Sequence, residues 1–159
     1  MKQSIDTDAD AIVVDEVFPH SPAVIWTALT SGALIARWLM APQGFSAVVG
    51  AHFTFQTRPA GAWDGTIRCE VLEVVAEERL SYAWKSGDEG NVGYGAMLET
   101  VVVFTLAKTE SGTRLRLVHS GFRLPKNEVA YGSMSEGWKK VIGRLNTVVT
   151  EEIAPDTTH

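Results

Sequence analysis

The chain has 159 residues, of which 45% are hydrophobic and 21% charged, a composition that is ordinary for one globular domain. A chain of this length buries about 68–70% of its unfolded surface, so its core needs no disulfide or metal for stability. The net charge of −5 argues against nucleic acid and anionic membranes as partners, because both require a basic stripe.

We expect no targeting signal in the first residues of the chain. Residues 1–11 are polar and acidic without an apolar core, so they are not a signal peptide, and we expect them to be poorly ordered. The single cysteine, Cys69, excludes an internal disulfide, which fits a reducing compartment. No apolar run approaches the ~20 residues that a membrane span needs. We therefore expect a cytoplasmic protein without membrane insertion.

A strand and two short helices are expected next. The β-branched stretch 11–19 predicts a strand that ends at Pro19. Ser21 and Pro22 are the residue types favoured at the N-cap and at the first position of a helix, and apolar residues then recur at helical spacing. The stretch 33–39, which ends before Pro42, predicts a second short helix.

From residue 45 to residue 120 the hydrophobic period changes to two, which predicts antiparallel strands with one solvated face. Turns are expected at 60–65, at 76–79 and at 110–113. The stretch 86–95 contains four glycines and predicts a flexible loop.

After Pro125 the period returns to 3.6 over roughly 25 residues, which predicts one long amphipathic helix, followed by a frayed tail at 154–159. A sheet with one wet face must cover its other face, and only this helix is long enough to do so. The sequence thus predicts one α+β domain over 12–153. In it, a curved antiparallel sheet of about six or seven strands wraps around a long C-terminal helix, with two short helices after the first strand.

Four stretches resemble a known family: "FPHSPAVIWTALTSGALIARWL", "EVLEVVAEERLSYAW", "TRLRLVHSGF" and "EGWKKVIGRL". They occur in the same order as in the START-related helix-grip superfamily, also called SRPBCC, and they extend over nearly the whole chain. The chain therefore resembles members of this superfamily. Within it the four stretches resemble the branch named after the activator of the ninety-kilodalton heat-shock protein ATPase. The eukaryotic activator has an additional chaperone-binding domain before its helix-grip part. We do not expect such a domain in this chain, which argues against chaperone activation.

The resemblance implies a hydrophobic cavity between the sheet and the last helix, open to small apolar or amphipathic ligands. The expected ligand-binding residues are those that the periodicity places inward near this cavity. They are Trp38, Phe53, Phe55, Tyr82, Trp84, Val102, Phe104, Leu117, His119, Phe122, Met134, Trp138, Val141 and Ile142. The alternative interpretation is that these residues simply fill the core.

His119 is the expected polar anchor of a ligand, because it shares the parity of Leu115 and Leu117. The alternative is a histidine that is hydrogen-bonded at the strand end. If the protein is a cyclase- or dehydratase-like enzyme on an aromatic or polyketide-type substrate, His119 and Tyr82 are its candidate catalytic residues. Binding without catalysis is the leading hypothesis, and a chaperone-related interaction or a homodimer is a third.

No cofactor and no metal ion are expected. The four histidines and one cysteine show no ligand spacing. The glycines lack the lysine and hydroxyl residue that end a phosphate-binding loop.

Overall fold

The computed structural model describes residues 11–153. Its elements, in chain order, are β1 (Ile12–Phe18), α2 (Pro22–Thr30), α3 (Gly32–Trp38), β2 (His52–Gln56), β3 (Thr66–Val75), β4 (Arg79–Ser86), β5 (Leu98–Lys108), β6 (Thr113–Ser120), α4 (Glu128–Val148) and η1 (Val149–Ile153). The expectations for 1–10 and 154–159 fall outside the described residues. Ala11, which we expected to be poorly ordered, is buried instead, and its carbonyl accepts a hydrogen bond from the Tyr131 hydroxyl at 3.3 Å.

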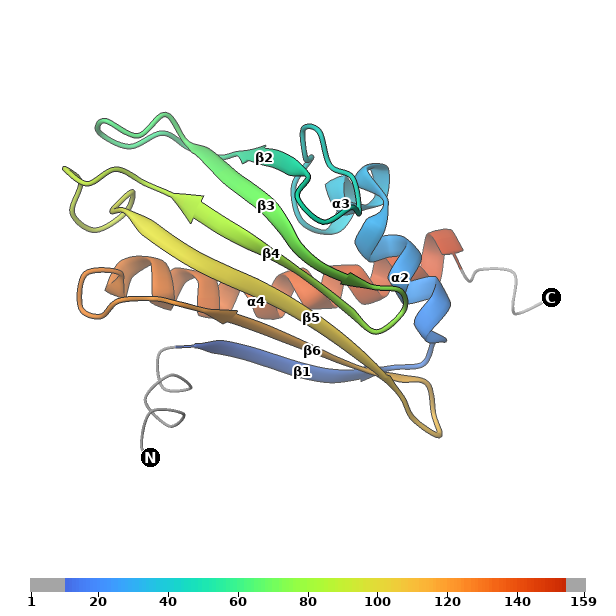
Figure 1. Ribbon diagram of the computed structural model, residues 1–159. Helices are drawn as coiled ribbons and strands as arrows, with labels where there is room; N and C mark the ends of the chain where they lie inside the picture. The colour runs from blue at the N-terminus through green and yellow to red at the C-terminus, as the bar shows by residue number, and fades with distance from the viewer. Residues whose placement is uncertain (1–10, 154–159) are drawn as a thin grey trace.

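The strands form one six-stranded antiparallel sheet in the order β1-β6-β5-β4-β3-β2. Figure 1 shows α4 running along one side of this sheet, with α2 and α3 at one end and the β2–β3 and β4–β5 loops at the other. The predicted α+β helix-grip architecture is therefore confirmed. A bulge between Val71 and Glu73 leaves Leu72 outward and helps the sheet bend, because bulges increase local twist.

The first short helix begins where the sequence predicts, and the second begins one residue before its predicted start at residue 33. The Ser21 hydroxyl accepts a hydrogen bond from the Val24 amide at 3.5 Å, and Pro22 occupies the first turn. The Ser31 hydroxyl caps α3 through the Leu34 amide at 3.3 Å. Gly32 is the first residue of α3, and the break between the two helices lies at Ser31.

The strand alternation correctly predicts the two faces of the sheet. The inward residues of β4 to β6 are buried, among them Tyr82, Phe104 and Leu117. Arg114 and Arg116 lie on the outer face, where Arg114 makes two hydrogen bonds to the Asp15 carboxylate at 2.7 and 2.6 Å. These charge-assisted hydrogen bonds lower the pKa of Asp15.

No helix within residues 11–153 is long and apolar enough to cross a membrane.

Candidate functional site

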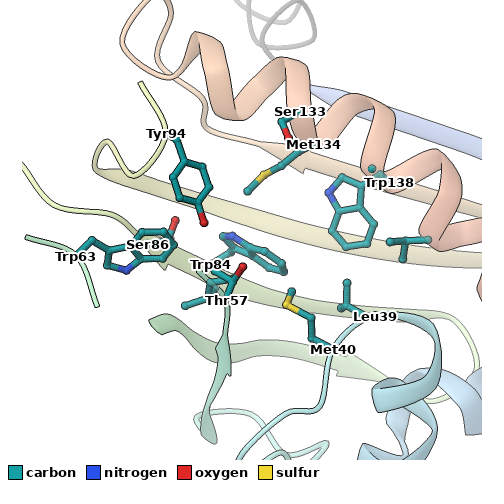
Figure 2. A pocket seen from close by; sticks show the side chains of 13 residues that line it. Leu39, Met40, Thr57, Trp63, Trp84, Ser86, Tyr94, Ser133, Met134 and Trp138 are labelled. Carbon is teal, nitrogen blue, oxygen red and sulfur yellow. The ribbon is translucent and has the colours of Figure 1, made fainter. Parts of the chain in front are cut away.

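A cavity of about 250 Å³ lies between α4, the end of the sheet nearest the β2–β3 and β4–β5 loops, and the segment after α3. Figure 2 shows its labelled side chains converging from these elements. Its lining has no charged side chain and is mostly apolar. The lining residues are Leu39, Met40, Thr57, Trp63, Ile67, Trp84, Ser86, Tyr94, Ser133, Met134, Gly137, Trp138 and Val141.

The wall from α4 is one stripe of the helix. Met134, Trp138 and Val141 are separated by four and three residues, so they lie on one face. Gly137 lies beside this stripe and also lines the cavity. A Cβ at this position would meet nothing within 4 Å, so no other segment approaches α4 closely there.

The wall opposite α4 depends on an anchored tryptophan. Trp38 ends α3, is fully buried, and its indole nitrogen donates a hydrogen bond to the Ala28 carbonyl at 3.0 Å. This bond joins α3 to α2 and sets the direction in which the chain leaves α3. Leu39 and Met40 follow immediately and reach the cavity.

Two loops form the remaining rim and are tied to each other. Asn91 donates hydrogen bonds to the Ala60 carbonyl at 2.7 Å and to the Gly95 carbonyl at 3.1 Å. The Tyr94 hydroxyl donates to the Arg58 carbonyl at 2.7 Å. The loop expected to be flexible is thus held by specific hydrogen bonds to the β2–β3 loop, and they place Tyr94 beside the cavity.

A smaller cavity of about 70 Å³ adjoins the main one. Both are lined by Trp63, Ser86, Tyr94, Ser133 and Met134, so these side chains separate the two spaces. Methionine side chains adapt readily to a neighbour's shape, so Met134 is suited to such a partition.

His119 lies behind the cavity wall in a chain of buried hydrogen bonds. The Trp138 indole nitrogen donates to Nδ1 of His119 at 2.9 Å, which requires Nδ1 to be unprotonated. Nε2 of His119 therefore carries the proton and donates to the Thr100 hydroxyl at 2.7 Å, and Thr100 donates to the Trp84 carbonyl at 2.9 Å. Burial lowers the pKa of His119 to about 3.

The expectation that His119 anchors a ligand requires correction. His119 does not line the cavity, and both of its ring nitrogens already have protein partners. Its role in the structure is to hold the Trp138 indole, which does line the cavity. The alternation along the strand correctly predicted that the His119 side chain points inward. Alternation does not show whether an inward side chain borders the cavity or lies in the core behind its wall.

The structure divides the predicted ligand-binding residues into two groups. Trp84, Met134, Trp138 and Val141 line the cavity. The others lie in the core outside its lining. Some of them pack there edge to face, as Phe53 does against Phe55 and Tyr82, with ring centroids 5.5 and 5.1 Å apart. These core residues are Trp38, Phe53, Phe55, Tyr82, Val102, Phe104, Leu117, His119, Phe122 and Ile142.

Several lining residues were not predicted from the sequence, because they lie in loops or between elements. Trp63 lies in a stretch expected to form a turn, Tyr94 lies in one expected to form a flexible loop, and Met40 follows a helix end. A signal was present, since a large aromatic residue within a glycine-rich loop is costly to expose and needs a surface to cover it.

The described part of the chain holds no cluster of side chains suited to bind a metal ion. Within residues 11–153 no three histidine, cysteine or carboxylate side chains gather closely enough to hold an ion. Burial raises the pKa of the Cys69 thiol to about 12, so this residue stays protonated and unreactive.

Known proteins resemble the chain in both sequence and fold. The family model of Activator of Hsp90 ATPase homolog 1-like proteins matches residues 19–150. Protein MLL2253 of Mesorhizobium loti has a similar structure, with a TM-score of 0.76 and 35% identity over 89% of this chain and 98% of its own. Protein BH1534 of Bacillus halodurans has a TM-score of 0.69 and 24% identity over 90% of this chain and 99% of its own.

A third similar structure is DynU16, a protein of the dynemicin biosynthetic locus. Its TM-score is 0.68 and its identity is 26%, over 89% of this chain and 48% of its own. Among proteins of curated function, none matches the chain significantly.

Proposed function

This chain belongs to the family of Activator of Hsp90 ATPase homolog 1-like proteins, and we propose that it binds a small hydrophobic or amphipathic molecule in the cavity beside α4. The observation that carries the proposal is an open space of about 250 Å³ whose lining is mostly apolar and uncharged. Ligand sites are typically concave and apolar, with a few polar groups that orient the ligand.

The size of the cavity limits the affinity. Burying about 300 Å² of apolar ligand surface contributes roughly 7 kcal/mol, while association costs at least about 4 kcal/mol. The difference corresponds to a dissociation constant in the millimolar range. Useful affinity therefore requires at least one polar contact in addition to hydrophobic burial.

Catalysis on an aromatic or polyketide-type substrate is the second candidate. The likeness to DynU16, from the dynemicin biosynthetic locus, favours it. The two candidate catalytic residues, His119 and Tyr82, argue against catalysis. A histidine with a pKa of about 3, such as His119, is a weak base near neutral pH. Burial also raises the pKa of Tyr82, which makes that hydroxyl a weaker acid. Binding is thus the better supported function.

Filling the cavity from α4 tests the proposal. We expect Gly137→Leu to weaken the binding of the neutral fluorescent probe N-phenyl-1-naphthylamine at least tenfold, because the new side chain occupies the space. The free energy of unfolding should not fall, since a glycine within a helix costs up to ~1 kcal/mol relative to a good helix former. Probe fluorescence and urea unfolding give the two readouts.

Gly143→Leu is the matched control, because Gly143 lies in the same helix, is exposed and does not line the cavity. This variant should gain similar helix stability and bind the probe as the wild type does. If Gly137→Leu binds the probe as tightly as the wild type does, or if both variants lose it equally, the cavity is not the binding site.

A further inference from the structure

The indole N–H of Trp84 is buried without a hydrogen-bond partner. Trp84 is 3% exposed, and no acceptor among the described residues lies within reach of its Nε1. The other buried indoles all donate, and their acceptors are the Ala28 carbonyl for Trp38 at 3.0 Å, the Thr66 carbonyl for Trp63 at 2.9 Å and Nδ1 of His119 for Trp138 at 2.9 Å. A buried donor without a partner destabilises the fold, so its presence requires an explanation.

Trp84 occupies a central place in the cavity wall. Figure 2 shows its ring between Tyr94 and Met40, with the nitrogen on the side of Tyr94. Its ring packs against Phe55 and Trp138, with centroid distances of 5.6 and 6.0 Å. These contacts hold the indole in place, so the N–H cannot simply turn toward bulk solvent.

The surroundings restrict the group that could accept this hydrogen bond. Neither the main cavity nor the adjoining one has an aspartate, glutamate, lysine, arginine or histidine in its lining. An ionised ligand group placed there would lose its hydration without gaining a counter-charge. A neutral oxygen, by contrast, needs only a donor, and the Trp84 N–H is a donor that no described residue engages. The nitrogen itself is buried, so neighbouring lining side chains must shift for a ligand oxygen to reach it.

We propose that Nε1 of Trp84 donates a hydrogen bond to a neutral acceptor oxygen of the ligand, such as the carbonyl of a ketone, quinone or ester. The ligand class is then an apolar molecule that carries such an oxygen at its buried end. This inference rests on the proposed binding function, because it assigns the polar contact within the same cavity.

A pair of probes with the same shape tests the inference. 1-Acetylnaphthalene carries a carbonyl where 1-isopropenylnaphthalene carries a methylene group, and 1-naphthoate carries a charged carboxylate. We expect Trp84→Phe to weaken binding of the ketone roughly tenfold more than binding of the hydrocarbon, because only the ketone uses the N–H. The hydrocarbon also serves as the control for the smaller size of phenylalanine. Naphthoate should bind the wild type most weakly.

A second measurement does not depend on the variant. In ¹⁵N-labelled wild-type protein, the Trp84 indole proton should shift downfield when the ketone binds and should not do so with the hydrocarbon. Through-bond correlations from the indole proton to the side-chain and backbone atoms of Trp84 assign its resonance. The indole protons of Trp38 and Trp63, which already have acceptors, should move little with either probe.

The outcomes separate this inference from the proposed function. If both probes bind and Trp84→Phe weakens them equally, or if the Trp84 proton responds alike to both, the inference is overturned while the binding function stands. If neither probe binds, nor N-phenyl-1-naphthylamine, the binding function fails and this inference fails with it.

Discussion

Lowering the pH from 7 to 5 should reduce the free energy of unfolding by about 2 kcal/mol through His119 alone. Burial lowers the pKa of this histidine in the folded protein to about 3, whereas its ordinary value is 6.5. Between these values the unfolded chain binds a proton that the folded chain does not. Stability is therefore complete above about pH 6.5 and falls by about 1.4 kcal/mol per pH unit as the pH decreases toward 3.

Protonation would also break a specific contact. Nδ1 of His119 accepts the hydrogen bond of the Trp138 indole, and a protonated Nδ1 becomes a donor facing another donor. The histidine is fully buried, so water cannot replace the lost partner. This conflict adds to the cost of burying the charge.

Urea unfolding at pH 7, 6 and 5 measures the effect, with His119→Gln as the comparison. The variant should be less stable at pH 7, because the glutamine amide differs in shape from the imidazole and does not reproduce both of its hydrogen bonds. Between pH 7 and pH 5, however, the variant should lose about 2 kcal/mol less stability than the wild type does. The interval lies above the range in which Asp15 and Asp64 titrate, since the pKa values of both are lowered from 3.8. Parallel decreases in the two proteins would refute the assignment to His119.

Phe104→Ala should lower the free energy of unfolding by about 3–5 kcal/mol. Phe104 is fully buried at the centre of the inner face of the sheet, where its ring lies 6.0 Å from Trp38 and 6.1 Å from both Tyr82 and Trp138. Removing the ring deletes three aromatic contacts and leaves a cavity that the rigid neighbours cannot fill. Chemical unfolding at pH 7 measures the loss.

Phe104→Leu distinguishes a core residue from a ligand contact. Leucine keeps most of the volume, so this variant should lose only about 1–2 kcal/mol. Because Phe104 does not line the cavity, N-phenyl-1-naphthylamine should bind the variant within about twofold of the wild type. A large loss of probe affinity with little loss of stability would show that Phe104 contacts the ligand after all.

The sequence predicted the elements and their faces well because both depend on short-range chemistry. The predicted N-cap Ser21 accepts a hydrogen bond from the amide three residues later, which is a purely local interaction. The alternation that turns Leu115, Leu117 and His119 inward is likewise a property of consecutive residues in one strand.

The placement of the cavity could not be read from the sequence in the same way. Phe53 and Trp84 share the same inward pattern, yet one packs among aromatic rings and the other borders the open space. The difference arises from what faces each side chain across the fold. Tyr94 reaches the rim only because its hydroxyl meets the Arg58 carbonyl, 36 residues earlier in the chain.

The sequence by itself determined an antiparallel sheet, a long amphipathic helix against it, and the set of side chains that turn toward their interface. Only the tertiary structure decided which of those side chains border empty space and which buried polar groups have hydrogen-bond partners. It also showed that the Trp84 N–H has no such partner. The physical reason is that periodicity reports the direction of a side chain relative to its own backbone. Cavities and hydrogen-bond partners depend on distances between segments far apart in the chain, and these exist only once the chain has folded.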